Sequence, residues 1–254
     1  KQAAELGNPF GMIGYADTLL KEEESENNEQ VALGYYKKAA ELGNSVGMVK
    51  YGDLLMQTNH NHSDQMESVK YYKLAADKDD TYGMLRYADE LFNGILIPAN
   101  KKEAIKYYKK SADMGNTLAM IKYGDLLMIG DNVQMNKKEA VKYYKRAFDL
   151  GFDLGMIKYG DCLMAGVEVQ EDQKEAVRLY KIAVDKGNTE GMIRYGDCLM
   201  NGKGIKIDKK EASEYYKKLA NEGNKEAMIC YANMLEKGEG IPIDISEASR
   251  LYKM

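Results

Sequence analysis

The stretch Met120-Ile121-Lys122-Tyr123-Gly124-Asp125-Leu126-Leu127 decides the fold, because it recurs along the chain at an unvarying interval. A methionine three residues before each tyrosine keeps the same step. A fixed period of this size indicates an array of structural repeats, each packed mainly on its neighbours. The tyrosine returns every 36 residues, at Tyr15, Tyr51, Tyr87, Tyr123, Tyr159, Tyr195 and Tyr231.

Each repeat begins with the pattern of an amphipathic helix. In the unit that starts at Asn116, the side chains of Met120, Tyr123 and Leu127 are three and four residues apart, which places them on one helical face. Asn116 has the chemistry of an N-cap, and Gly130 is suited to end the helix in a left-handed conformation. The sequence therefore predicts a first helix and then a short turn.

A second helix follows in every repeat. Asn136 and Glu139 have the spacing of a capping box, Tyr144 falls on the expected apolar face, and Gly151 can stop the helix. We therefore predict a helix-turn-helix unit. The same capping register gives Asn28, Asp64, Asn100, Asn136, Asp172, Asp208 and Asp244.

The repeats predict a single array over residues 1–254, with no linker or second domain. Lys1 aligns with Lys37 and Lys253 with Lys217, so both ends fall inside a second helix and appear truncated. We expect a slice of a longer protein, or ends covered by something else. The predicted units are residues 8–43, 44–79, 80–115, 116–151, 152–187, 188–223 and 224–254.

Composition narrows the class of protein. The net charge of −4, with many charges of both signs, argues against a nucleic-acid binder. No apolar run approaches the roughly 18 residues of a membrane span. Cys162, Cys198 and Cys230 show no pairing within a repeat, which predicts free thiols in a reducing compartment. We expect a cytoplasmic protein; a cytoskeletal association is the alternative, and the lone sequon at Asn61 only weakly favours the endoplasmic reticulum lumen.

The repeat resembles the Sel1-like repeat, a relative of the tetratricopeptide repeat with a longer, glycine-marked turn. The clearest segments are residues 212–224 and the turns at residues 202–208 and 238–244. The resemblance implies an all-α fold, a right-handed α/α solenoid of about seven 36-residue repeats whose first helices line the concave side. It also implies the usual role of such arrays, which is to hold other proteins. Secreted bacterial relatives carry a cysteine pair in each repeat, which this chain lacks.

The chain shows no catalytic or metal-binding constellation. His60 and His62 are its only histidines and lie in a polar turn, so neither a nucleophile–base pair nor a metal site is predicted. The acidic turn at residues 22–26 lacks the spacing of a calcium loop. The aspartates occur once per repeat, unlike a catalytic carboxylate pair. We expect no enzyme activity and no cofactor.

The candidate binding surface is a stripe along the first helices. Leu118, Lys122 and Asp125 lie opposite the core face on a helical wheel. A lysine or arginine three residues before an aspartate can pair with it locally, which would make the stripe a self-satisfied charged face. The other interpretation is a groove for a peptide or partner helix, with apolar anchors. Its proposed residues are Val46, Lys50, Asp53, Tyr82, Arg86, Asp89, Leu118, Lys122, Asp125, Leu154, Lys158, Asp161, Arg194 and Asp197.

These patterns favour a non-catalytic scaffold or adaptor that binds protein partners on the concave face. One alternative is a structural spacer or lattice component of a larger, cytoskeletal assembly. Another is a regulatory array attached to an enzyme domain outside this chain. The stripe changes character at Glu190 and Glu226, where the apolar series ends. The partner's identity does not follow from the sequence.

Overall fold

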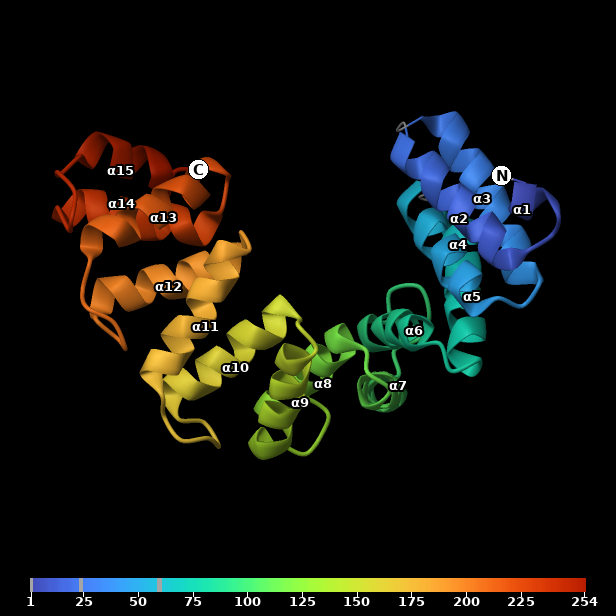
Figure 1. Cartoon of the computed structure of the whole chain (residues 1–254), viewed down its shortest axis with the longest axis horizontal. Helices are drawn as coiled ribbons and strands as arrows, with labels where there is room; N and C mark the ends of the chain where they lie inside the picture. The colour runs from blue at the N-terminus through green and yellow to red at the C-terminus, as the bar shows by residue number, and fades with distance from the viewer. Residues whose placement is uncertain (1, 23–24, 59–60) are drawn as a thin grey trace. The chain divides into compact units, whose positions relative to one another are not determined.

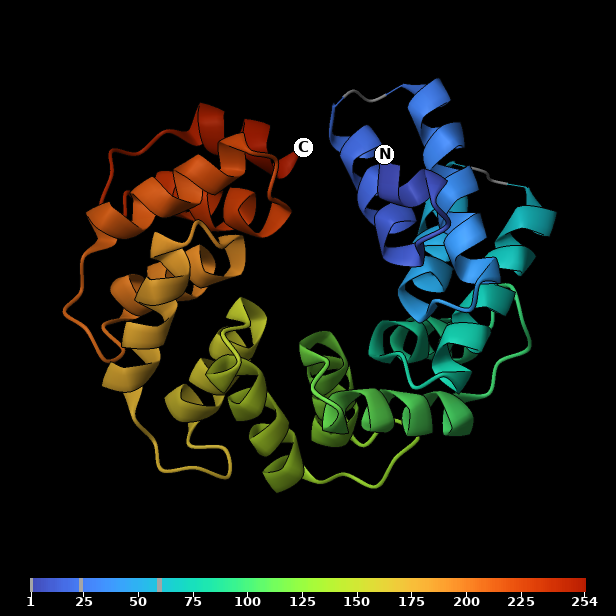
Figure 2. The same cartoon turned by 45° about the vertical axis from the view of Figure 1, so that its right-hand side comes forward.

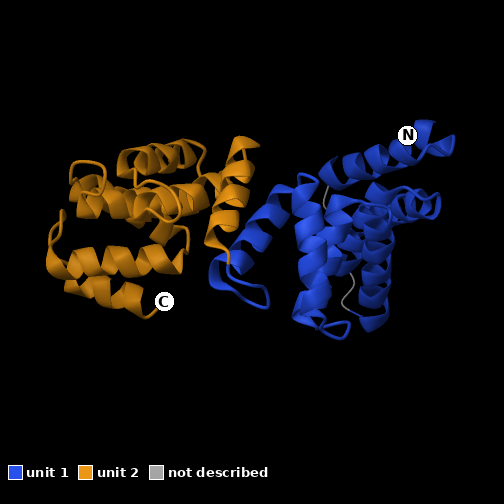
Figure 3. Cartoon of the chain, turned by 90° about the horizontal axis from the view of Figure 1, so that it is seen from below, with its two compact units in different colours: residues 1–135 blue, residues 136–254 orange. Residues whose placement is uncertain are grey.

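The chain forms helices throughout the residues that the structure describes. This computed structural model describes residues 2–22, 25–58 and 61–254, and no strand occurs among them. It divides into two compact units, Lys1–Met135 and Asn136–Met254, shown in Figure 3. The all-α repeat fold predicted from the sequence is confirmed.

Unit 1 is a succession of helices in which each packs on the next (Figure 1). The first helices of its repeats are α2, α4, α6 and α8, and the second helices are α3, α5 and α7. Its helices are α1 (Gln2–Glu5), α2 (Pro9–Glu22), α3 (Glu26–Glu41), α4 (Ser45–Thr58), α5 (His62–Asp77), α6 (Thr81–Asn93), α7 (Lys101–Asp113) and α8 (Thr117–Ile129).

Unit 2 repeats the same arrangement, and both views show its successive helices side by side (Figure 2). Here the first helices are α10, α12 and α14, and α9, α11, α13 and α15 are second helices. Its helices are α9 (Lys137–Asp149), α10 (Asp153–Ala165), α11 (Gln173–Asp185), α12 (Thr189–Asn201), α13 (Lys209–Asn221), α14 (Lys225–Lys237) and α15 (Ile245–Tyr252).

The predicted caps of α8 form as expected, whereas Phe152 at the start of α10 supplies no side-chain cap. The Asn116 side chain accepts a hydrogen bond from the backbone N–H of Ala119 at 2.9 Å, and Gly130 ends α8 with a φ of 78°. Both interactions satisfy backbone groups that a helix end leaves unpaired. Local sequence therefore sets where α8 begins and ends.

The caps of α3 and α5 correct the predicted register. Asn28 and Asp64 lie inside the first turns of these helices, and the N-caps are Ser25 and Asn61, three residues earlier. In both helices the earlier side chain accepts from the backbone N–H that the predicted cap now carries, at 3.2 and 2.9 Å. Serine is a favoured N-cap, and Ser25 stands in the segment where later repeats have the glycine-marked turn. Helix α3 therefore begins one turn earlier than predicted. The predicted capping residue is confirmed for α7, α9, α11, α13 and α15.

The core of each unit lies between the paired helices. Met84 and Leu85 of α6 are 0 and 1% exposed, and Leu199 of α12 is 1% exposed. Ala75 and Ala183, which lie against Gly83 of α6 and Gly191 of α12, are fully buried. Small residues at these places let neighbouring helices of one unit approach closely and bury the apolar side chains between them.

Candidate functional site

Five aspartates at one repeat position of the first helices each accept a hydrogen bond from a tyrosine of the second helix of their own repeat. The phenol of Tyr108 donates to Asp89 Oδ1 at 2.6 Å, and the ring of Tyr108 is 4% exposed. The partner lies 19 residues after the aspartate in every described case. The other pairs are Tyr36 with Asp17, Tyr72 with Asp53, Tyr180 with Asp161 and Tyr216 with Asp197.

A glycine of the first helix makes room for this tyrosine. A Cβ built at Gly52 would lie 2.5 Å from the Tyr72 ring. Because the ring is buried at that contact, its hydroxyl needs a partner, and the Asp53 carboxylate, 2.9 Å away, supplies one. Burial, together with the charge of Asp53, raises the pKa of Tyr72. The phenol therefore stays protonated and acts as a donor.

A cation from the following repeat completes the arrangement. Lys122 Nζ lies 2.9 Å from Asp89 Oδ1, and Arg86 Nε lies 2.9 Å from Asp53 Oδ1. We call each aspartate with its tyrosine and its cation a rung. Rungs form at Asp17–Tyr36–Lys50, Asp53–Tyr72–Arg86, Asp89–Tyr108–Lys122 and Asp161–Tyr180–Arg194.

The rungs pair each cation across repeats rather than with the aspartate three residues later, although Arg194 also pairs along its own helix with Glu190, at 2.7 Å. Lys50, Arg86 and Arg194 reach back 33 residues to the aspartate of the preceding repeat rather than forward three residues. The first helices lie side by side, so the carboxylate of the neighbouring helix is the one within reach. Asp125 and Lys158 hold the equivalent positions in the sequence.

The contacts within the rungs also favour the charged forms of their acidic and basic side chains. Burial favours the neutral form of Asp17, but hydrogen bonds from Lys50 and Tyr36 outweigh it and lower the pKa of this carboxyl. Burial opposes the charge on Arg86, while Asp53 raises the pKa of its guanidinium. In these four rungs the charges of the stripe are therefore paired within the array, and they link successive repeats.

The series of rungs ends in unit 2. Cys230 stands where the cation would be, so Asp197 accepts from Tyr216 at 2.6 Å but forms no ion pair in the described part of the chain. A pocket of 390 Å³ opens beside Asp197 and includes Arg194 and Lys203. In the last repeat Asn233 replaces the aspartate and accepts from the Tyr252 hydroxyl at 2.8 Å.

The apolar residues of the predicted stripe take no part in the rungs. They occupy the repeat position four residues before the cation. Phe10, Val46 and Tyr82 are 72, 42 and 63% exposed on α2, α4 and α6. Leu118 of α8 and Leu154 of α10 are half-buried. The structure thus separates the stripe into fixed charges and an exposed apolar row in unit 1.

The three cysteines are free thiols, and two of them are buried. Burial, with a further contribution from the neighbouring aspartate, raises the pKa of Cys162 and of Cys198 to about 11. At pH 8 we expect both to react with a disulfide reagent about a hundredfold more slowly than free cysteine, because thiolate is the nucleophile. Colorimetric thiol titration of the Cys230→Ser protein, folded and in urea, measures this. Equal rates in both states would contradict it.

The histidine and acidic turns lie partly outside the residues that the structure describes. His60, Glu23 and Glu24 lie outside the described residues, while His62 begins α5. Within residues 2–22, 25–58 and 61–254, no three histidine, cysteine or carboxylate side chains gather as metal ligands would. Among the same residues, no helix combines the length and apolar character that a bilayer crossing requires.

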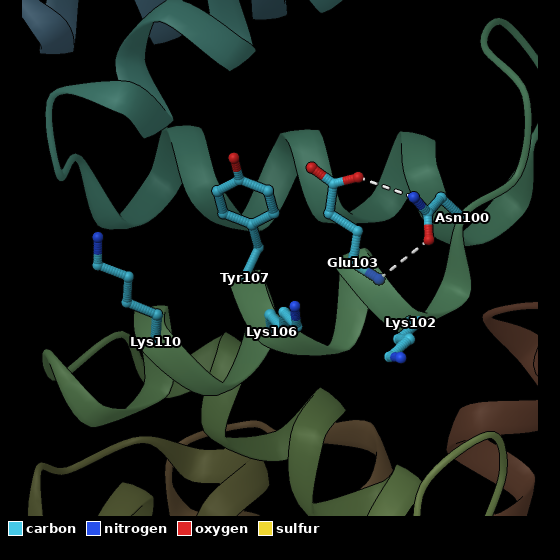
Figure 4. A pocket seen from close by; sticks show the side chains of 6 residues that line it. All are labelled: Asn100, Lys102, Glu103, Lys106, Tyr107 and Lys110. Carbon is cyan, nitrogen blue, oxygen red and sulfur yellow. Dashed lines mark hydrogen bonds between the residues drawn. The ribbon is translucent and has the colours of Figure 1, made fainter.

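Sequence reasoning missed two concavities on the second helices of unit 1. One, of 420 Å³, follows α7 and is lined by Lys102, Lys106, Tyr107 and Lys110 (Figure 4). The other, of 370 Å³, lies along α5. A comparison of the outer positions of the repeats could have indicated the second, because α5 carries apolar residues where the other second helices carry mostly polar or charged ones.

Two solved structures of repeat proteins are similar to this chain over most of its length. The chain is similar to a Sel1 repeat protein from Oxalobacter formigenes, with 25% identity, a TM-score of 0.80 and coverage of 94% of this chain and 95% of that one. It is also similar to c5321, a protective antigen of uropathogenic Escherichia coli with an SLR fold, at 26% identity and a TM-score of 0.74. That match covers 99% of this chain but only 54% of the antigen.

A third likeness concerns the fold alone. Immunity protein Pa5087 from Pseudomonas aeruginosa is 13% identical, with a TM-score of 0.54 and coverage of 82% of this chain and 80% of that one. No curated protein matches the chain. The sequence model of the Sel1 repeat matches residues 11–44, 61–80, 81–116, 117–152, 153–188, 189–224 and 225–254. The chain therefore belongs to the Sel1 repeat family.

Proposed function

We propose that the chain is a non-catalytic scaffold that binds an extended segment of a partner protein along the first helices. Sel1 repeat proteins are generally protein-interaction scaffolds, which supports this class of function. The apolar row of unit 1, defined as Phe10, Val46, Tyr82 and Leu118, would supply the anchors. The three unpaired thiols support a reducing compartment such as the cytoplasm.

The observation that carries this proposal is the exposure of the apolar row. Three large apolar side chains lie at one repeat position on the first helices of successive repeats, each more than 40% exposed. Single exposed apolar residues are ordinary on a protein surface, but a row in register can bury several side chains of one ligand. An extended segment that crosses the first helices would meet one anchor per repeat.

The rungs support the same surface in a different role. Lys50, Arg86 and Lys122 are bound to aspartates of the preceding repeats, so their charges are largely compensated. Their side chains remain between one third and one half exposed. They would hold the first helices at a fixed spacing and offer hydrogen-bond donors at the edge of the row, while the apolar anchors supply most of the affinity.

The test replaces the anchors rather than the charges. We expect the Phe10→Glu, Val46→Glu, Tyr82→Glu triple variant to lose its partner, because each glutamate places a charge where an apolar contact would form. Affinity should fall at least about a hundredfold, since two lost anchors of about 1.4 kcal/mol each correspond to that factor. Capture from native extract, identification by mass spectrometry and titration of the purified partner measure it.

A matched control uses equally exposed apolar residues elsewhere in unit 1. Leu42 and Met114 follow the second helices and are 59 and 47% exposed. The Leu42→Glu, Met114→Glu variant should retain the partner, and circular dichroism should show equal helix content in all three proteins. Retention of every partner by the folded anchor variant would contradict the proposal. Charge reversal at Arg86 or Lys122 is unsuitable, because it would break rungs and the repeat stacking with them.

A further inference from the structure

The outer face of α5 differs from the other second helices of the chain. Met66, Lys70 and Leu74 follow one another at four-residue intervals along the helix, so they lie on one line. The same line of α7 is Lys102, Lys106 and Lys110. Met66 and Leu74 are each 37% exposed. Two repeat positions that carry lysines on α7 therefore carry accessible apolar side chains on α5.

These two side chains border a concavity rather than a flat surface. The pocket of 370 Å³ along α5 is floored by Val69 and by Tyr87 of α6, which are 4 and 8% exposed. Ile97, from the turn between α6 and α7, is half-buried at its edge. The pocket is large enough for a bulky apolar side chain, and its walls are mainly hydrocarbon.

The rim of the pocket is positively charged. Lys70 and Lys73 line it and form no ion pair within the described residues, while Asp77 is the single acid of the rim. The Lys70 ammonium lies 6.0 Å from the centre of the Tyr71 ring, which leaves its hydrogen-bond donors available. A ligand with carboxylates beside its apolar group would thus meet cations that have no competing partner.

The basic rim continues onto α7. Tyr87 in the α5 pocket and Tyr107 in the α7 concavity stack edge to face, with ring centres 5.3 Å apart. Lys102 and Lys106 line the α7 concavity and likewise form no ion pair in the described chain. Figure 4 shows the acid of this concavity, Glu103, already bound by the Asn100 side chain, at 2.8 Å. The two concavities adjoin through this pair of rings, with apolar residues along α5 and four lysines without an ion pair in the described chain, Lys70, Lys73, Lys102 and Lys106, lining them.

We propose that this surface of α5 and α7 binds an acidic amphipathic segment of a partner protein. A bulky apolar side chain enters the α5 pocket between Met66 and Leu74, and flanking Asp or Glu residues face Lys70, Lys73, Lys102 and Lys106. Charge complementarity selects this chemistry, because a basic segment would be repelled and a purely acidic one would leave the pocket unfilled. The site is independent of the apolar row on the first helices.

A peptide-display selection on the whole chain tests the proposal without prior choice of a ligand. Random 16-residue peptides are selected on the wild-type protein and counter-selected on the Met66→Lys, Leu74→Lys variant. That variant copies the lysines of α7 at the same repeat positions, so it should fold, which circular dichroism verifies. We expect the enriched peptides to combine bulky apolar residues with Asp and Glu.

Affinities of one enriched peptide then separate the contributions. Met66→Lys with Leu74→Lys, and separately Lys70→Glu with Lys73→Glu, should each weaken binding at least about tenfold, the effect of losing one good contact. The control pair Lys142→Glu and Lys145→Glu makes the same change at the same positions of α9 and should leave affinity unchanged. Enrichment of basic peptides, no enrichment at all, or equal affinity for wild type and the α5 variants would overturn the proposal.

Discussion

Replacing Asp89 with alanine is expected to lower the free energy of unfolding by about 2–4 kcal/mol, because two bonded partners lose their acceptor. Tyr108 donates to Asp89 at 2.6 Å and is 4% exposed, so its hydroxyl would be left unpaired next to the core. Lys122, 2.9 Å from the same carboxylate, would lose its ion pair. Urea denaturation followed by circular dichroism measures the change.

The chain provides its own control for this experiment. Asn233 occupies the aspartate position in the last repeat and accepts from Tyr252 at 2.8 Å. Asp89→Asn should therefore keep the bond from Tyr108 and lose only the partly exposed ion pair, which lowers stability by no more than about 1 kcal/mol. If the alanine and asparagine variants were equally stable, the tyrosine bond would not be what makes the rung important.

The Gly204→Val substitution is expected to lower the free energy of unfolding of unit 2 by about 2–5 kcal/mol, through backbone strain together with overpacking. Gly204 has a φ of 69°, and a Cβ there would lie 2.3 Å from the backbone oxygen of Gln173 at the start of α11. A β-branched side chain can neither adopt that backbone conformation cheaply nor clear the neighbouring helix. Urea denaturation reports the loss.

A variant at Glu168 separates backbone strain from overpacking. Glu168 holds the same repeat position with a φ of 55°, so a side chain is tolerated at positive φ one repeat earlier. Glu168→Gly should change stability by less than about 1 kcal/mol, because relief of strain and added freedom of the unfolded chain oppose one another. A similarly small effect of Gly204→Val would show that the turn moves away from α11 and that the close approach is not required.

The sequence did not decide how the charges of the stripe pair. Lys122 and Asp125 lie on one line of α8, and the sequence could not tell whether Lys122 would pair along that helix or across to its neighbour. The carboxylate that Lys122 reaches, on Asp89, is 33 residues away in the chain. The period of 36 could have suggested such a link, but only the spacing of packed helices decides which carboxylate is within reach.

The early caps of α3 and α5 show a similar limit. The sequence offers Ser25 and Asn28 as competing N-caps three residues apart, and both have suitable chemistry. The structure uses Ser25. The helix extends because the first turn lacks the glycines that hold the corresponding segment of later repeats in a left-handed conformation.

The sequence by itself determined the helix pairs, most of their caps and the buried face of each helix, from Met120 and Tyr123 to Tyr144. These features depend on neighbours within about four residues, so periodicity and capping chemistry express them directly. Only the tertiary structure decided that the charges of the stripe are bound in rungs, that the apolar row is exposed, and that Met66 and Leu74 border a pocket. Each of these depends on which side chains of the adjacent repeat come within a few ångströms, and that distance is set by the packing of helices rather than by their order in the chain.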